Sequence, residues 1–310
     1  MSKIVFFGTP SFSAPALRAL ADSPFRPVAV VTAPDKPVGR KQILTPSPVA
    51  VTAQELGIPV LKLATLRDDA SWAQFQALEA TLCVVVAYGK LIPKRFLEAA
   101  PKGWLNIHPS LLPQYRGPAP IQQAIIDGQS STGVSIMLLD ETEDTGPVIA
   151  QRPWTIAPLD ATYAQCHDTL AQMGAELLLE CLPSYLDGSL APTTQDDALA
   201  THSRKLTRTD GKLDPSKSVT DLANLIRALA DNPGTWFSVD SIDYNIFSAA
   251  AHAQPPTHPQ GTLVAWHNGL ALACSDGYLE IHEIQKSGST RQAITDFMRG
   301  NAHLVGQVVS

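Results

Sequence analysis

Residues 1–190 alternate between short apolar runs and amphipathic stretches, and this alternation restricts the possible folds more than any other feature. The apolar runs are nearly continuous, as strands are when both faces of a parallel sheet are covered. They lie at residues 3–7, 27–33, 59–63, 82–88 and 104–109, and helical stretches at 13–22, 46–57 and 68–80 separate them. This order predicts an α/β domain with a doubly wound, mostly parallel, Rossmann-like sheet.

The pattern continues and then changes. A helix is predicted at 119–128, strands at 132–140 and 146–156, and a long amphipathic helix at 161–182. The stretch that follows is polar, rich in turn residues and weakly periodic, which is typical of a linker. We therefore expect a first domain at residues 1–187, a linker at 188–206 and a second domain at 207–310.

The second domain has a different composition of elements. One helix, at 219–231, precedes β segments at 234–240 and 261–285. The pairs Asn268-Gly269 and Asp276-Gly277 are strong signals for hairpin turns. A domain of short strands joined by tight turns is typical of a small barrel, so we predict an OB-like β-barrel here.

Composition excludes several classes of protein. The formal net charge of −6 argues against a general coat for nucleic acid, although it leaves room for a local basic patch. No apolar run approaches the length of a membrane span. The four cysteines are far apart and form no ligand spacing, which indicates reduced, buried thiols and no metal site. We expect a cytoplasmic monomer without a bound metal.

Nucleotide-binding fingerprints are missing. The turn after the first predicted strand holds Gly8, and the next glycine is Gly39, so the sequence has no GxGxxG. It also has no GxxxxGK[ST], GxSxG or HExxH. NAD, ATP, serine hydrolase and zinc protease chemistry therefore lose support, and Gly8 is interpreted as a residue that permits a tight turn.

Polar side chains occur where the fifth predicted strand ends. Asn106 and His108 are two residues apart, so they project to the same face of a strand. Ligands of open α/β sheets bind at the carboxyl ends of the strands. An amide donor beside an imidazole suits an oxyanion that develops at an acyl carbon. The alternative, an Asn that caps a turn and a His satisfied in the core, is about equally probable on these residues alone.

A second group of polar residues follows the strand at 132–140. Asp140, Glu141, Glu143 and Asp144 precede Thr-Gly-Pro. Acidic loops are often only solvated, and that interpretation can hold for three of the four. A carboxylate brought next to His108 would orient the imidazole ring.

These residues resemble a known family. Asn106-x-His108, "SLLPQYRG" at 110–117 and "DTG" at 144–146 are similar to motifs of the folate-dependent formyltransferases. The stretch "APDKPVGRKQILTPSPV" at 33–49 looks like the loop inserted in the methionyl-tRNA formyltransferases of that superfamily, and the β-rich carboxyl-terminal part looks like their tRNA-binding domain. The resemblance covers nearly the whole chain.

The resemblance implies an activity and a set of site residues. The activity is transfer of the formyl group of 10-formyltetrahydrofolate to the α-amine of initiator methionyl-tRNA, which yields formylmethionyl-tRNA for translation initiation. Three groups of residues are implied. They are Asn106, His108 and Asp144 for catalysis; Tyr88, Gly89, Ser110, Leu111, Leu112 and Pro113 for the folate; and Arg40, Lys41, Lys205 and Arg208, with Lys212 nearby, for tRNA.

Two other functions remain open. The first is a formyltransferase that acts on a sugar-nucleotide amine, with the same fold and the same catalytic residues. The basic loop at 33–49 argues against it, because a small nucleotide substrate does not need such a loop. The second is a folate-binding or tRNA-binding protein without activity, which would not require all three of Asn106, His108 and Asp144. The basic residues can also be ordinary solvated surface charges.

Overall fold

The computed structural model describes residues 2–39, 41–156 and 161–310. The chain forms two compact units. The first comprises Met1–Pro120, Ser131–Thr155 and Gln165–Ser203, and the second comprises Ile121–Ser130, Ile156–Ala164 and Arg204–Ser310. The first unit thus includes residues 188–203, which the sequence predicts as part of a linker.

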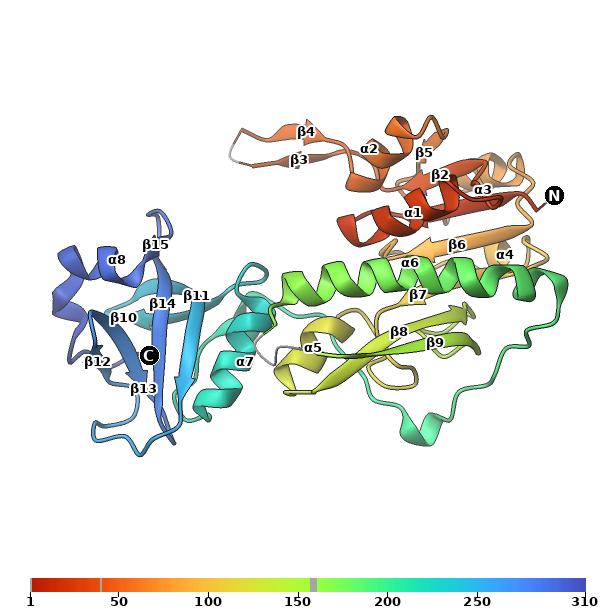
Figure 1. Ribbon diagram of the computed structural model, residues 1–310. Helices are drawn as coiled ribbons and strands as arrows, with labels where there is room; N and C mark the ends of the chain where they lie inside the picture. Colours follow the sequence, from red (N-terminus) through yellow and green to blue (C-terminus); the bar gives the residue numbers. More distant parts are fainter. Residues whose placement is uncertain (1, 40, 157–160) are drawn as a thin grey trace. The chain divides into compact units, whose positions relative to one another are not determined.

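Among the described residues, seven strands form the sheet of the first unit, in the order β5-β2-β1-β6-β7-β8-β9 (Figure 1). The strands from β5 to β7 are parallel, whereas β8 and β9 are antiparallel to their neighbours. This sheet confirms the predicted fold class. The strands are β1 (Ile4–Gly8), β2 (Ala29–Thr32), β5 (Val60–Lys62), β6 (Leu82–Val86), β7 (Trp104–His108), β8 (Ser131–Leu138) and β9 (Val148–Thr155).

Two helices of the first unit begin at residues whose side chains cap them. Ser47 accepts a hydrogen bond from Ala50 N at the start of α2, and Asp68 accepts one from Ser71 N at the start of α3. The first unit contains α1 (Ala14–Ala21), α2 (Pro48–Glu55), α3 (Asp69–Gln76), α4 (Lys94–Leu97) and most of α6 (Tyr163–Asp187). Helix α5 (Pro120–Ile126) belongs to the second unit from Ile121 onward. The helix predicted at 161–182 is confirmed and extends one turn further.

Helix α6 lies along the sheet of the first unit, as Figure 1 shows. Its approach to β7 depends on Gly174. A Cβ at that position would lie 2.5 Å from Cγ2 of Ile107. Ile107 stands between the two polar residues at the end of β7, so α6 supports the strand that carries them.

The strand order places a switch point between β1 and β6. From β1 the chain moves outward through β2 to β5, and it then returns to the other side of β1 as β6 and β7. Crevices at the carboxyl ends of such strands bind ligands. Tyr88 follows β6, and Asn106 and His108 end the neighbouring β7, so the predicted site residues meet at one edge of the sheet.

The loop at 33–49 contains structure that the sequence analysis did not predict. Strands β3 (Lys36–Val38) and β4 (Ile43–Thr45) pair as an antiparallel hairpin (Figure 1). Val38, Ile43 and Leu44 on this hairpin are 56%, 62% and 68% exposed. Large apolar side chains clustered in the open are typical of a contact surface.

The second unit contains an antiparallel sheet and, among its described residues after 204, two helices in addition to α5. Its strand order is β10-β11-β14-β13-β12, with β15 beside β14. Both predicted hairpins are confirmed, since β12 pairs with β13 and β13 with β14 across the two Gly-containing turns. Strand β11 and helix α8 were not predicted. The elements are α7 (Val219–Leu229), β10 (Thr235–Val239), β11 (Ile242–His252), β12 (Leu263–Trp266), β13 (Gly269–Ala273), β14 (Tyr278–Lys286), β15 (Gln292–Ala293) and α8 (Ile294–Asn301).

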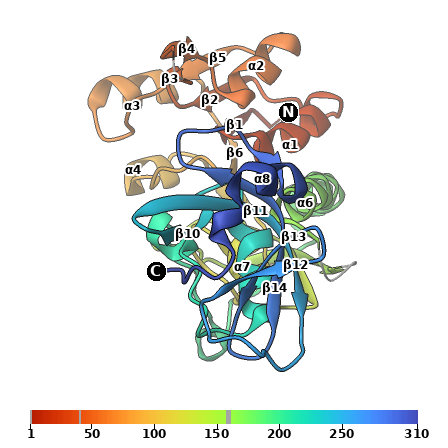
Figure 2. The ribbon, with the colours of Figure 1, turned by 90° about the vertical axis from the view of Figure 1, so that its left-hand side faces the viewer.

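The final residues join the two edges of this sheet. Ser310 exchanges two backbone hydrogen bonds with Ser238 on β10, and Leu263 N on β12 donates to the carbonyl oxygen of Gln307. Because β10 and β12 are the ends of the strand order, these bonds pair edges that would otherwise stay open. The curvature of the strands can be followed in Figure 2. The predicted barrel-like domain is confirmed in this form.

An aromatic cluster forms the core beneath one face of the first sheet. The rings of Phe75 and Phe96 have centroids 5.0 Å apart, and Phe75 lies 5.6 Å from Trp104 and 6.0 Å from Phe7. Phe75 is 2% exposed. This cluster ties helix α3 to strands β1 and β7, so it fixes the strand that ends in His108.

We expect Phe75→Ala to lower the free energy of unfolding by about 3–5 kcal/mol, because it removes a buried ring and leaves a cavity. Urea denaturation followed by circular dichroism measures this loss. The matched control is Leu91→Ala, since Leu91 is 72% exposed and its truncation leaves no cavity. Equal losses for the two variants would contradict the assignment of Phe75 to the supporting core.

Candidate functional site

Strand β7 delivers two polar side chains to one edge of the sheet. His108 is the last residue of β7 and is only 4% exposed, whereas Asn106 is half-buried. In the antiparallel pairing with β8, His108 lies opposite Ser135 and Asn106 opposite Met137. The alternation of a strand puts Asn106 and His108 on the same face, as predicted.

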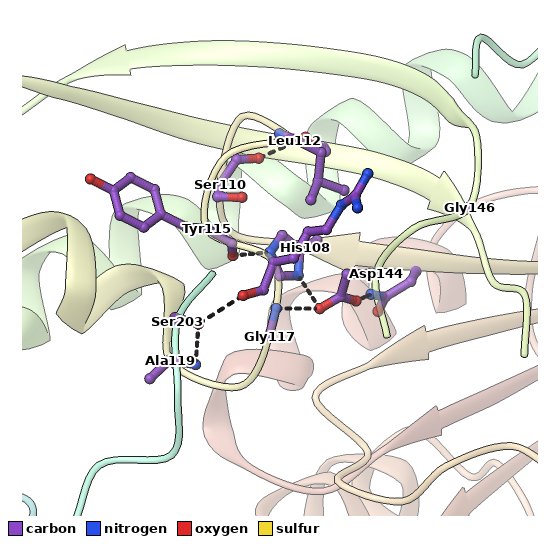
Figure 3. A network of polar contacts seen from close by, with 12 residues as sticks. His108, Ser110, Leu112, Tyr115, Gly117, Ala119, Asp144, Gly146 and Ser203 are labelled. Carbon is purple, nitrogen blue, oxygen red and sulfur yellow. Dashed lines mark hydrogen bonds and ion pairs between the residues drawn. The ribbon is translucent and has the colours of Figure 1, made fainter. Parts of the chain in front are cut away.

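A backbone carbonyl determines which nitrogen of His108 carries a proton. Nε2 lies 3.0 Å from the carbonyl oxygen of Tyr115, which can only accept a hydrogen bond (Figure 3). Nε2 is therefore the protonated nitrogen. Nδ1 is the other ring nitrogen, and it lies 3.5 Å from Oδ2 of Asp144.

Asp144 is held between three groups. Its Oδ2 accepts a hydrogen bond of 2.8 Å from the backbone N–H of Gly117 (Figure 3). Its Oδ1 lies 3.5 Å from Nδ2 of Asn106. Its backbone takes a left-handed conformation, with φ of +55°. Asn106, His108 and Asp144, the three predicted catalytic residues, are thus brought together.

Two other acidic residues of this loop have separate contacts, and the third, Glu143, is exposed. Asp140 accepts hydrogen bonds from Thr142 and Thr145, which close the turn. Glu141 forms an ion pair with Lys94. These contacts leave Asp144 as the carboxylate of the loop that faces His108.

Two glycines let the backbones around Asp144 approach closely. A Cβ at Gly146 would lie 1.9 Å from the carbonyl oxygen of Leu138, and one at Gly117 would lie 2.4 Å from that of Ser203. Gly117 also has φ of +107°, a conformation that disfavours other residues. Each glycine is therefore required by the path of a loop that carries or holds the carboxylate.

The loop after β7 is fixed from the antiparallel strands. Ser135 Oγ accepts a hydrogen bond from Leu112 N and donates one to the carbonyl oxygen of Ser110. Gln151 Nε2 on β9 donates to the carbonyl oxygen of Leu112 and to Ser135 Oγ. Strands β8 and β9 thus define the shape of the segment that ends at Tyr115.

The residues predicted to hold folate follow the carboxyl ends of β6 and β7. They differ in burial, and the Ser110 hydroxyl already has a partner within the protein. Ser110 is fully buried, and its hydroxyl donates to the carbonyl oxygen of Gln114. Leu112 is buried, while Leu111 and Pro113 are half-buried. Gly89 is exposed with φ of +77°.

Tyr88 differs from the other predicted folate residues. It is 4% exposed, and its ring packs edge-on against Phe7 at 5.3 Å. Its hydroxyl group is buried with no hydrogen-bond partner within the described part of the chain. Burial raises the pKa of Tyr88 to about 12, so the hydroxyl keeps its proton.

The basic residues predicted to bind tRNA have different surroundings. Arg40 lies outside the described residues, and its neighbour Lys41 is exposed. Lys205 and Lys212 are exposed on the second unit. Arg208 is exposed but donates to Oδ1 of Asn245 and lies 5.3 Å from the centroid of the Trp236 ring, so it also has a structural contact.

Sequence reasoning missed several residues that shape the site. The Tyr115 carbonyl and the Gly117 N–H bond His108 and Asp144 through the backbone. The residue type at these positions therefore does not reveal that they hold the site. Gln195 and Thr201 belong to the polar stretch that was predicted as a linker. Arg116 is a side chain that the sequence could have indicated, because it lies within the motif "QYRG". The structure buries it to 4% exposure.

Other kinds of site are not found in the described ranges. No cluster of His, Cys, Asp and Glu residues there has metal-binding geometry. No described helix is both long and apolar enough to cross a bilayer. All four cysteines are free and buried, and burial raises the pKa of Cys181 to about 11 and that of Cys274 to about 12. Such thiols are poor nucleophiles.

Comparison with known proteins gives full-length matches. The formyl transferase family matches residues 2–182, and the formyl transferase C-terminal domain matches residues 205–302. The methionyl-tRNA formyltransferase of Methylococcus capsulatus is 40% identical over 301 residues, which are 97% of each chain. That of Listeria innocua is 39% identical over 97% of this chain and 96% of its own. The chain belongs to the methionyl-tRNA formyltransferase family.

Solved structures more distant in sequence share the fold of this family member. An N-formyltransferase from Helicobacter canadensis, solved with folinic acid and dTDP-3-aminofucose, aligns with a TM-score of 0.69 at 18% identity, over 92% of this chain and all of its own. HypX from Aquifex aeolicus, solved with tetrahydrofolic acid, aligns with a TM-score of 0.65 at 17% identity, over 96% of this chain and 47% of its own.

We expect Gly146→Ala to abolish most of the enzymatic activity of this family member, because the new Cβ would overlap the Leu138 carbonyl oxygen and displace the turn that holds Asp144. The measurement is the rate of formyl transfer, together with the thermal unfolding midpoint. Gly300→Ala serves as the control, since a Cβ at Gly300 on α8 meets nothing within 4 Å. Full activity of Gly146→Ala would contradict the steric argument.

Proposed function

We propose that this protein transfers the formyl group of 10-formyltetrahydrofolate to the α-amine of methionyl-tRNA. The observation that carries the proposal is the convergence of Asn106, His108 and Asp144 at the carboxyl end of β7, in a chain with full-length relatives named for this reaction. A formyl transfer needs donors for a developing negative charge and a group that accepts a proton. The site provides both.

The bound folate supplies the formyl carbon that the amine attacks. Simple α-amines titrate at about 7.7–8.0, so a useful fraction is neutral near pH 7 without a strong base. The protein therefore has two tasks: to stabilise the charge that develops on the formyl oxygen, and to accept the proton that leaves the amine.

The proton arrangement of His108 determines how it can help. Because Nε2–H donates to the Tyr115 carbonyl, His108 can donate to the formyl oxygen only through a protonated Nδ1, and the ring is then positively charged. Asp144 lies 3.5 Å from Nδ1 and balances that charge. Asn106 Nδ2 is the second donor, and the amide lies beside the same carboxylate.

Asp144 has a further role in this proposal. Gly117 N–H holds one of its oxygens, and the side chain is 14% exposed, so the carboxylate remains accessible. A fixed, partly exposed carboxylate can take the proton of the amine directly or through a water molecule. In the same position it keeps the His108 ring in a productive orientation.

We place the heterocycle of the folate at the switch point between β1 and β6. The buried hydroxyl of Tyr88 is unpartnered within the described residues, so it can bond a ligand that enters there. The exposed Gly89 leaves the adjacent backbone accessible, and Leu91 offers an exposed apolar side chain. We assign the folate to the loop after β6 together with the loop at 110–113, where apolar walls and backbone groups can hold a pterin.

The β3–β4 hairpin favours a large acceptor. It has exposed apolar side chains and the exposed cations Lys36 and Lys41, and it lacks a role in the core. A small acceptor has no use for such a surface, whereas a tRNA presents phosphates and bases to both kinds of side chain. We assign Lys41, in the turn of this hairpin, to tRNA, and also Arg40, which precedes it in the sequence and lies outside the described residues. Lys205 and Arg208 on the second unit are assigned as additional phosphate contacts.

Formylation of a sugar-nucleotide amine is the alternative function, and the Helicobacter canadensis N-formyltransferase, which shares the fold, was solved with dTDP-3-aminofucose. One assay separates the two reactions. Purified protein is mixed with 10-formyltetrahydrofolate and with either methionyl-tRNA or a dTDP-amino sugar. Formylation of methionyl-tRNA alone is the expected result, and formylation of the sugar alone would overturn the proposal.

We expect Asn106→Ala and His108→Ala each to lower kcat by about a hundredfold or more, because each removes a donor to the developing oxyanion. The combined variant should lose less than the product of the two effects, since both donors serve one transition state. Single-turnover formylation of methionyl-tRNA measures these rates. Near-normal turnover of either single variant would remove that residue from the oxyanion assignment.

We expect Arg40→Ala to raise the apparent KM for methionyl-tRNA and to flatten its dependence on salt, because a lost phosphate contact releases fewer counterions. The KM for 10-formyltetrahydrofolate should not change. Arg67→Ala is the control, since Arg67 is an exposed cation on the same unit outside the hairpin. Weaker folate binding with an intact salt slope would instead place the hairpin in the folate site.

A further inference from the structure

A polar segment without any catalytic motif holds both loops of the site. Residues 193–203, named here the strap, follow helix α6 and belong to the first unit. At one end, Thr193 exchanges backbone hydrogen bonds of 2.7 and 2.8 Å with Val148, the first residue of β9. At the other end, Arg116 N donates to the Thr201 carbonyl and Ser203 N donates to the Arg116 carbonyl, at 2.9 and 2.7 Å.

Gln195 in the strap binds the turn that carries the catalytic carboxylate. Its Nε2 donates to the backbone carbonyl oxygens of Asp144 at 2.9 Å and of Gly146 at 2.7 Å. Its Oε1 accepts two hydrogen bonds from the buried Arg116, at 3.1 and 2.9 Å. Both N–H donors and the oxygen of the amide are therefore engaged between the Asp144 turn and the loop after β7.

Thr201 in the strap bonds to Tyr115, the residue whose carbonyl holds His108. Its Oγ1 accepts a hydrogen bond of 2.8 Å from Tyr115 N. The carbonyl oxygen of the same Tyr115 accepts the Nε2–H of His108. Tyr115 has φ of +57°, which is costly for an aromatic residue and persists only where neighbouring bonds impose it. Thr201 supplies one of those bonds.

Ser203 completes the same arrangement. Its Oγ accepts from Ala119 N and lies 3.2 Å from the Arg116 carbonyl oxygen, and its own carbonyl is the atom that Gly117 must approach (Figure 3). Gly117 N–H is the donor to Asp144. The strap therefore contacts the segments on both sides of the His108–Asp144 pair.

We propose that Gln195 and Thr201 are positioning residues for formyl transfer, which fix Asp144 and the proton arrangement of His108 from outside the catalytic motifs. This inference rests on the proposed function. The bonds of the two side chains end on the peptide groups of Asp144, Gly146 and Tyr115, so a change in the strap moves the reacting groups. A displacement of about 1 Å in such groups can cost about a hundredfold in rate.

Substitutions of Gln195 test whether its N–H donors are the groups that matter. Gln195→Glu keeps an oxygen acceptor for Arg116, but its carboxylate cannot donate to the carbonyls of Asp144 and Gly146 and would repel them. We expect Gln195→Glu and Gln195→Ala both to lower kcat by about tenfold to a hundredfold. The KM values for both substrates should change little, because Gln195 and Thr201 are not among the residues assigned to bind folate or tRNA.

Matched variants separate positioning from folding. Thr201→Val keeps the shape of the side chain and removes the acceptor, and it should lower kcat in the same way with the thermal unfolding midpoint nearly intact. It also serves as the test variant should Gln195→Ala fail to fold. Thr194→Ala, at an exposed position beside Gln195, should behave as the wild type. Wild-type kcat for both Gln195→Glu and Thr201→Val would overturn the proposal.

A double-mutant cycle and a spectrum complete the test. In an Asp144→Asn background, Gln195→Ala should lower the residual rate by much less than it does in the wild type, because its effect passes through Asp144. Full additivity would contradict this route. The ¹⁵N signals of the His108 ring in the free protein, assigned with His108→Ala, should shift in Thr201→Val and Gln195→Ala but not in Thr194→Ala.

The spectrum also distinguishes failure of the strap proposal from failure of the proposed function. If the wild-type protein does not formylate methionyl-tRNA, the proposed function falls, while shifted His108 signals would still support control of the ring by the strap. Unshifted signals in both strap variants would overturn that control even in an active enzyme.

Discussion

The His108 imidazole donates its Nε2–H to the carbonyl oxygen of Tyr115, seven residues later in the chain. Burial makes this bond decisive, because a ring that is 4% exposed cannot exchange its partner for bulk water. With Nε2 committed, Nδ1 is the atom left for Asp144 and for a ligand. The loop after β7, its supports on β8 and β9, and the position of Asp144 all serve this one arrangement.

Close packing of two backbone segments fixes the position of the Asp144 carboxylate. Gly117 and Gly146 allow two loops to approach within a distance that a Cβ would prevent, and the carboxylate of Asp144 is then held by a peptide N–H rather than by a flexible side chain. Because the carboxylate is already held in place, little conformational entropy has to be lost when a substrate binds. The site also depends on segments far away in sequence, since Gly117 must pass the carbonyl of Ser203.

The parts that could be predicted were those with a strong local signal. The strand–helix alternation gave the parallel sheet, and the glycine-containing turns gave the hairpins β12–β13 and β13–β14. The spacing of Asn106 and His108 placed them on one face of β7. The β3–β4 hairpin, β11 and α8 were missed. The β3–β4 hairpin contains Pro37 and Gly39, and the second half of β11 is the run Ser248–Ala251, so their periodicity is weak. Helix α8 is only eight residues long, and such a short pattern is easily missed.

The sequence by itself determined the fold class, the family resemblance and the side chains that can perform the chemistry, because periodicity and short motifs are local properties. The resemblance singled out Asp144, but only the tertiary structure placed its carboxylate beside His108 and determined that Nε2 rather than Nδ1 carries the fixed proton. It also turned a stretch with the composition of a linker into a segment bonded to both loops of the site. These outcomes depend on backbone groups, which every residue possesses and which leave no mark on the sequence.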